Sequence, residues 1–367
     1  MDPRIEMLAH NLLDYSLGLK PGDRVLVEGE IGSEELLLAL VDAAYKRGAE
    51  PFLELYDSRL HRQWLLGATQ KMMETRTSWE LRRLEDLQAH LFVQAGDNAS
   101  ELVDVPAKAM EAYRRTSEPY WDELLTRKWC TLRFPTASAA QAAGMSTQAF
   151  EDFCFSVCSL DYARMSRAME PLVQLMSHTD RVQISGPGTD LSFSIAGIPA
   201  VKAAGECNIP DGEVFTAPVR GSVNGTVTFN TPSLHDGVTH DRVRLTLKEG
   251  RIVDAEGSDT ERLAQVLDTD QGARYLGEFA LGVNPLIKRP MKDTLYDEKI
   301  AGSLHLTPGR AYEEADNGNR SSVHWDLVLI QTPEWGGGEI WFDGVLVRKD
   351  GRFVTSELQG LNPENLI

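Results

Sequence analysis

The sequence has 367 residues, with 37 lysines and arginines against 55 aspartates and glutamates, and therefore a formal net charge of −18. So acidic a chain is a poor binder of nucleic acid, because nucleic-acid phosphates attract Lys and Arg. No stretch of eighteen or more continuous apolar residues occurs, so no membrane-spanning segment is expected. A hydrophobic fraction of 42% is typical of a globular protein, and the length is enough for two domains with sizeable cores.

The start of the chain and its cysteines predict a cytoplasmic protein. The sequence begins Met-Asp-Pro-Arg-Ile-Glu and lacks the basic and then apolar pattern of a secretory signal. The chain has only four cysteines, and none has CxxC spacing. Cys154 and Cys158 would share one face of a helix, but ordinary buried thiols are favoured over a zinc pair.

The first part of the chain alternates between strand and helix patterns. Short apolar runs bounded by turn residues predict strands, and apolar residues at helical spacing predict helices. The expected strands are 24–28, 51–56, 91–94 and 130–134, with helices at 3–19, 33–47, from 58, and 106–128. This rhythm predicts an α/β domain, a parallel sheet with covering helices. The turn after the first strand, Glu28-Gly-Glu-Ile-Gly-Ser, lacks the dinucleotide-binding fingerprint, so this domain is interpreted as a scaffold.

The second part is expected to be β-rich. Residues 146–178 have a helical pattern that indicates a core and connector segment, and a hairpin signal follows around Gly186-Pro-Gly-Thr-Asp190. Further alternating strands are expected at 225–229, 242–247 and 251–255, with a helix at 259–267. The predicted organisation is therefore an α/β domain with a helical connector over 1–178, followed by an α+β catalytic domain over 179–367.

Three segments of the second part are rich in side chains that bind metals. They are 208–218, 277–282 and a split segment of 303–312 and 322–326, and the candidate ligands in them are two glutamates, two histidines and one aspartate. This set of oxygen and nitrogen donors without sulfur suits one or two divalent ions such as Zn, Co or Mn.

Residues 322–330 read Ser-Val-His-Trp-Asp-Leu-Val-Leu-Ile and are rich in β-formers. On a strand, His324 and Asp326 would project to one face and Trp325 to the other. The pair could grip a metal, whereas the alternative is a hydrogen-bonded His–Asp pair at a strand start.

The phrases NIPDGEVFTAP, SVNGTVTF, GEFALGVNP, TLYDEKIAGSLHL and SSVHWDL occur in this order along the chain. On these phrases the sequence resembles the thermophilic-type aminopeptidases, a family of dinuclear metallopeptidases that includes aminopeptidases T and S. The resemblance implies a metal-dependent aminopeptidase that removes N-terminal residues from short peptides. It also implies two divalent metal ions and a homodimer. The sequence departs from the family pattern at Thr307-Pro308, just before the loop of Tyr312.

The resemblance also implies the site residues. The expected catalytic residues are Tyr312, as a hydrogen-bond donor to the developing oxyanion, and Glu213. The implied metal ligands are Glu213, Glu278, His305, His324 and Asp326.

Other readings remain open at this point. His305, His324 and Asp326 alone would form the facial triad of a mononuclear Fe(II) ring-cleaving dioxygenase on the same fold. A non-catalytic peptide-binding relative is a further alternative. Other candidates have a simpler interpretation, which is a turn residue for Asp211, a solvated charge pair for Glu298-Lys299, and loop residues rather than a second metal site for His235 and His240.

Overall fold

The computed structural model describes residues 2–235 and 237–367, which form two compact units. The first unit contains Met1–Ser159 and Gly205–Pro210, and the second contains Leu160–Ala204 and Asp211–Ile367. Helix α8 (Tyr162–His178) belongs to the second unit, where it contacts strands β7 and β9 and the C-terminal segment. This division differs from the boundary expected at residue 178, because the connector helix packs on the β-rich part that follows it.

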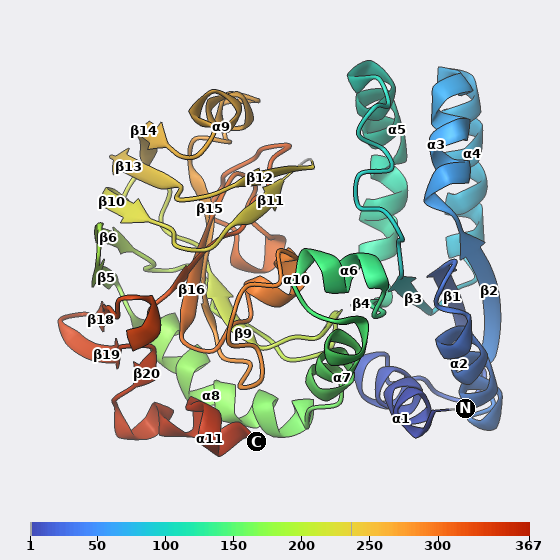
Figure 1. The fold of residues 1–367 in the computed structure, drawn as a ribbon, viewed down its shortest axis with the longest axis horizontal. Helices are drawn as coiled ribbons and strands as arrows, with labels where there is room; N and C mark the ends of the chain where they lie inside the picture. Colours follow the sequence, from blue (N-terminus) through green and yellow to red (C-terminus); the bar gives the residue numbers. More distant parts are fainter. Residues whose placement is uncertain (1, 236) are drawn as a thin grey trace. The chain divides into compact units, whose positions relative to one another are not determined.

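The first unit is built on a five-stranded parallel sheet in the order β2-β1-β3-β4-β8 (Figure 1). This is the strand order of a doubly wound α/β sheet, with one late strand added beside β4. The strands are β1 (Arg24–Glu30), β2 (Glu50–Tyr56), β3 (Ala89–Gln94), β4 (Lys128–Arg133) and β8 (Asn208–Ile209). The helices are α1 (Pro3–Asn11), α2 (Glu34–Lys46), α3 (Ser58–Gly67), α4 (Gln70–Leu84), α5 (Ala107–Leu125), α6 (Ala137–Ala142) and α7 (Thr147–Cys158), with a π-helical turn at Leu12–Ser16.

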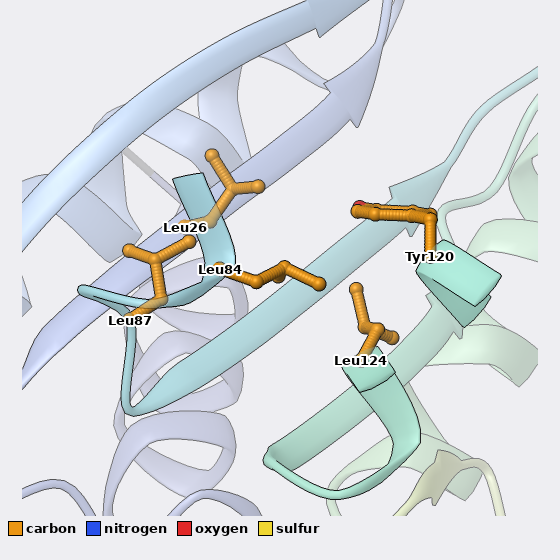
Figure 2. Close-up of a cluster of buried hydrophobic side chains, with 5 residues drawn as sticks. All are labelled: Leu26, Leu84, Leu87, Tyr120 and Leu124. Atoms are coloured by element: carbon orange, nitrogen blue, oxygen red, sulfur yellow. The ribbon is translucent and has the colours of Figure 1, made fainter. Parts of the chain in front are cut away.

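Apolar side chains from three elements form the core on one face of this sheet. Leu26 of β1 packs with Leu84, Leu87, Tyr120 and Leu124, which come from the end of α4, the turn after it, and α5 (Figure 2). All five are at most 5% exposed. The neighbours of Leu26 along β1 point to the opposite face, because side chains alternate along a strand.

The second unit contains two antiparallel sheets and a separate hairpin of β11 and β12 (Figure 1). The larger sheet consists, in spatial order, of β14 (Arg251–Glu256), β13 (Arg244–Lys248), β10 (Asn224–Thr228), β6 (Thr189–Ser194), β5 (Arg181–Gly186), β18 (Glu339–Phe342), β19 (Val345–Lys349) and β20 (Arg352–Phe353). The smaller sheet consists of β17 (Leu327–Ile330), β16 (Ser303–Pro308), β15 (Leu276–Gly282), β9 (Glu213–Thr216) and β7 (Val201–Ala203). The other elements are β11 (Ser233–His235), β12 (Val238–His240), α9 (Thr260–Leu267), α10 (Thr294–Asp297), α11 (Pro363–Leu366), and 3-10 turns at Glu313–Ala315, Pro333–Trp335 and Ser356–Leu361.

Three adjacent strands of the smaller sheet, including the edge strand β17, are buried along their whole length. Every residue of β15, β16 and β17 is buried, and Phe193 of the larger sheet meets Phe279 of β15 edge-on at 5.1 Å between ring centroids. A polar side chain on these strands must therefore find a partner or a ligand, because an unpaired buried charge is costly.

The predicted fold class, an α/β part followed by a β-rich α+β part, is confirmed. None of the helices within the described residues is long and apolar enough to cross a bilayer.

Candidate metal centre

Neighbouring strands of the smaller sheet bring the five predicted ligand residues together. Glu213 is the first residue of β9, Glu278 lies on β15 and His305 lies on β16. His324 and Asp326 come just before β17. The order β17-β16-β15-β9 therefore assembles the group from segments far apart in sequence.

Glu278 lies at the middle of this group. Its Oε1 is 3.3 Å from His305 Nε2, and its Oε2 is 3.4 Å from His324 Nε2. Burial alone would raise the pKa of Glu278, but hydrogen bonds from the two histidines outweigh it and bring the pKa to about 2. Burial lowers the pKa of each histidine, but the surrounding carboxylates outweigh it and raise both pKa values to about 10. The site therefore favours positive charge at its centre.

Glu213 and His305 carry buried polar atoms that are left unsatisfied. Glu213 Oε2 and His305 Nδ1 lie 3.6 Å apart, and neither has a hydrogen-bond partner among the described residues. Buried polar atoms normally have hydrogen-bond partners, so two neighbouring buried atoms without one indicate a position for a ligand. An imidazole nitrogen and a carboxylate oxygen at this separation fit a divalent cation bound between them.

The donor atoms fall into overlapping groups in which all atoms lie within 4.8 Å of one another. One group joins Glu213, Glu278 and His305, and a second joins Glu278, His324 and Asp326. Glu278 is common to both. Two adjacent cation positions that share one carboxylate are thus compatible with these residues.

His324 and Asp326 lie close together as expected, but the strand that was expected to carry them is shorter. His324 Nε2 lies 3.4 Å from Asp326 Oδ1, whereas β17 begins only at Leu327. His324 makes one isolated bridge to Gly309, and its Nδ1 lies 2.9 Å from the carbonyl oxygen of Arg310. This contact orients the ring so that Nε2 faces Glu278 and Asp326.

Lys299 is a member of the site that the sequence reasoning missed. Its side chain is 0% exposed, and Nζ lies 2.7 Å from Glu213 Oε1 and 3.6 Å from Asp211 Oδ1. Nζ also donates to Glu298. Burial alone would lower the pKa of Lys299, but the carboxylates raise it well above its usual value, so the lysine is charged.

Glu298 and Asp211 differ from their expected roles for the same reason. The interpretation of Glu298-Lys299 as a solvated pair is wrong, because the Glu298 side chain is only 12% exposed and has a donor atom within 4.8 Å of those of His305 and Asp326. Burial raises the pKa of Glu298 well above its usual value. Asp211 does cap its own turn, since Oδ1 accepts from the Gly212 N–H at 2.9 Å, but it is also fully buried. In the sequence, Glu298 and Asp211 look like exposed charged residues, and only their burial in the folded protein indicates a role in the site.

Tyr312 lies beside this group. Its ring centroid is 4.7 Å from that of His324 and 5.6 Å from that of Phe215, and 47% of the residue is exposed. The departure from the family pattern before it does not open the site. Pro308 ends β16, and Thr307 donates from Oγ1 to Asp326 Oδ1 at 2.5 Å.

The two histidines of the β11–β12 hairpin pack on Trp325. The His235 ring stacks on Trp325 at 4.7 Å, and the His240 ring meets it edge-on at 4.9 Å. The Trp325 indole N–H donates to Ser233 Oγ at 2.8 Å. The hairpin therefore holds Trp325, the residue between His324 and Asp326, in place.

Known proteins are similar to this sequence over almost its whole length. The profile of the thermophilic metalloprotease family (M29) matches residues 1–352. Aminopeptidase T of Thermus thermophilus is 28% identical, with 96% of this chain and 98% of the relative covered. Aminopeptidase PepS of Streptococcus thermophilus is 26% identical, with 93% and 94% covered.

The fold is shared with a solved structure. The wild-type aminopeptidase AmpT from Thermus thermophilus superposes with a TM-score of 0.80 at 24% sequence identity, covering 96% of this chain and 99% of that one. Neither a ring-cleaving dioxygenase nor a non-catalytic relative finds support in these comparisons. The predicted family and its class, a metal-dependent peptidase, are confirmed: this chain belongs to the thermophilic metalloprotease family M29.

Proposed function

We propose that this protein is a metal-dependent aminopeptidase that removes N-terminal residues from short peptides. Support comes from the family and from relatives that are aminopeptidases by name. The observation that carries the site is the unsatisfied pair Glu213 Oε2 and His305 Nδ1, buried 3.6 Å apart beside Glu278. If these two residues were ordinary members of the core, both atoms would have hydrogen-bond partners.

In this proposal the two overlapping groups each hold one divalent ion. Glu278 would contribute to both positions, because its two oxygens face different histidines at 3.3 and 3.4 Å. Glu213 and His305 complete the first position, and His324 and Asp326 complete the second. Bound ions of this kind lower the pKa of water and polarise the scissile carbonyl.

The charge of the buried cluster supports two ions rather than one. Four carboxylates beside the site carry four negative charges when ionised, whereas burial favours the neutral form of a fifth, Glu298, and Lys299 returns one positive charge. One divalent ion would leave a net negative charge, which favours a second ion because uncompensated buried charge is costly. The oxygen and nitrogen donors suit Zn, Co or Mn. The carboxylates are Asp211, Glu213, Glu278, Glu298 and Asp326.

Three of these side chains have further roles in the proposal. Lys299 occupies Glu213 Oε1 at 2.7 Å and so directs Oε2 towards His305. Through this geometry Glu213 acts both as a ligand and as a catalytic carboxylate. Tyr312, half exposed above His324, donates a hydrogen bond to the oxygen that gains charge as the peptide bond is attacked.

We also infer a cytoplasmic homodimer that acts on peptides. The resemblance to the family supports the dimer. No disulfide joins the four cysteines, which suits a reducing compartment.

The test is a paired measurement on purified protein. Bound metals are determined by elemental analysis, and release of N-terminal residues from a peptide panel is assayed before and after chelation. About two Zn, Co or Mn per chain, with activity lost on chelation and restored by metal, is the expected result. One iron per chain with no cleavage of any peptide would overturn the proposal.

A further inference from the structure

A hollow in the second unit lies outside the residues assigned to the metal centre. It has a volume of about 540 Å³ and is formed by the loop before β10, the start of β14 and the segment between α9 and β15. Its lining residues are Arg220, Arg251, Asp268, Asp270, Gln271, Arg274 and Tyr275. Three arginines around one hollow are notable in a chain whose net charge is −18.

The carboxylates of this hollow are already engaged. Asp268 Oδ1 lies 2.5 Å from Arg274 Nε. Asp270 accepts from Ser321 Oγ at 2.8 Å and from the Ser322 N–H at 2.8 Å. Burial alone would raise the pKa of Asp270, but these hydrogen bonds outweigh it and lower the pKa. Both carboxylates therefore stay ionised, and Asp268 also acts electrostatically on Arg251, so the three arginines exceed the two aspartates by one positive charge.

Arg220 and Arg251 have no carboxylate within 4.0 Å in the part of the chain that the structure describes. Arg220 is nevertheless held in place, because its guanidinium lies 4.3 Å from the centroid of the Tyr275 ring. A guanidinium stacked on an aromatic ring keeps its N–H groups free to bind anions in the plane of the fork.

The backbone of this arginine is also fixed. Gly250 has φ +81°, and a Cβ at this position would lie 1.8 Å from the carbonyl oxygen of Arg220. The β13–β14 turn and the Arg220 loop thus fit together only because residue 250 is glycine. On the opposite wall Arg274, with its side chain 17% exposed, donates to the carbonyl oxygen of Ile252 at 3.2 Å.

We propose that this hollow binds a small molecule that carries two or more neighbouring anionic groups, phosphates or carboxylates. Arg220 and Arg251 supply bidentate hydrogen bonds, and Arg274 adds positive charge behind them. The volume exceeds what a single phosphate fills and lies within the range of small-molecule sites. Because the long-range field of an acidic chain repels anions, binding here depends on these local arginines.

Isothermal titration calorimetry at low ionic strength tests the inference with two probes, pyrophosphate and triglutamate whose N-terminus is acetylated so that it is no substrate for an aminopeptidase. Wild-type protein is compared with Arg220→Ala and Arg251→Ala. Arg244→Ala is the matched control, because it removes the same charge from an exposed pair on the neighbouring strands β13 and β14. Circular dichroism checks that all variants are folded.

At least one probe is expected to bind the wild type. Arg220→Ala and Arg251→Ala should each lower the affinity for that probe by about ten-fold or more, while Arg244→Ala changes the affinity little. Preference for pyrophosphate would identify a phosphorylated ligand, and preference for triglutamate a carboxylate-rich one. The inference is overturned if neither probe binds, if all three variants weaken binding equally, or if binding ignores the hollow variants and disappears on chelation. The measurement needs no turnover, so its failure is distinct from failure of the peptidase proposal.

Discussion

Glu278→Gln provides the sharpest test of the proposed ligand arrangement. One oxygen of Glu278 faces His305 at 3.3 Å and the other faces His324 at 3.4 Å, so the residue belongs to both groups of donor atoms. Glu213 and Asp326 each belong to only one of the two groups that contain Glu278. The amide keeps the size of the side chain but removes its charge and one acceptor oxygen.

The expected loss follows from these positions. Loss of even an outer-shell partner costs 10- to 100-fold in metal affinity, so loss of a direct ligand should cost at least about 100-fold, or about 2.7 kcal/mol, at each position it serves. At a free metal concentration where the wild type holds two ions, Glu278→Gln should retain close to none. Glu213→Gln and Asp326→Asn should each retain about one.

Elemental analysis after equilibrium dialysis against a series of buffered metal concentrations measures these stoichiometries. Calorimetry without enzyme turnover gives the affinities independently. If Glu278→Gln kept one ion with wild-type affinity while Glu213→Gln lost both, the bridging role would belong to Glu213 and the reasoning from the two histidine contacts would be refuted.

Three further outcomes are expected. Tyr312→Phe should lower kcat by about 10²- to 10³-fold with metal content unchanged, and a drop in bound metal instead would indicate a structural role. Lys299→Met should destabilise the metal-free protein by about 3–5 kcal/mol in urea unfolding, because it leaves buried carboxylates without their cation; a loss below about 1 kcal/mol would contradict this. Burial and the neighbouring Arg76 lower the pKa of His61 from 6.5 to about 4 in the folded state, so the folded protein binds fewer protons than the unfolded chain between these values. The stability present above pH 6.5 should thus fall by about 2 kcal/mol from pH 7 to pH 5, and His61→Phe should remove that fall; parallel profiles for variant and wild type would exclude it.

Local patterns were sufficient to predict most elements of the fold. The alternating runs of the first unit correspond to β1 through β4, and the Gly-Pro-Gly turn joins β5 to β6 as expected. Strand β8 could not be predicted, because only two residues pair with β4 and their partner lies far away in sequence. The helix α8 was found, but its unit depends on what it packs against and not on its own residues.

The candidate site shows the same limit. The motif resemblance named Glu278 and the four other predicted ligands that the structure places beside it. It missed Lys299, whose side chain is 0% exposed, because a Glu-Lys dipeptide has no sequence signal for burial. The hairpin histidines were seen, but their stacking on Trp325 depends on a tertiary contact that spacing does not encode.

The return of Gly205–Pro210 to the parallel sheet has a consequence for how this chain can be divided. A shortened chain that ends at Ser159 would lack β8, so one edge of β4 would have no neighbouring strand. A chain that begins after Ser159 would still carry six residues that belong to the missing unit. Neither unit can thus be exchanged between relatives as one continuous segment. Exchange of the first unit also needs the short segment Gly205–Pro210, which ends directly before Asp211. The boundary between the two units therefore lies at no single position in the sequence.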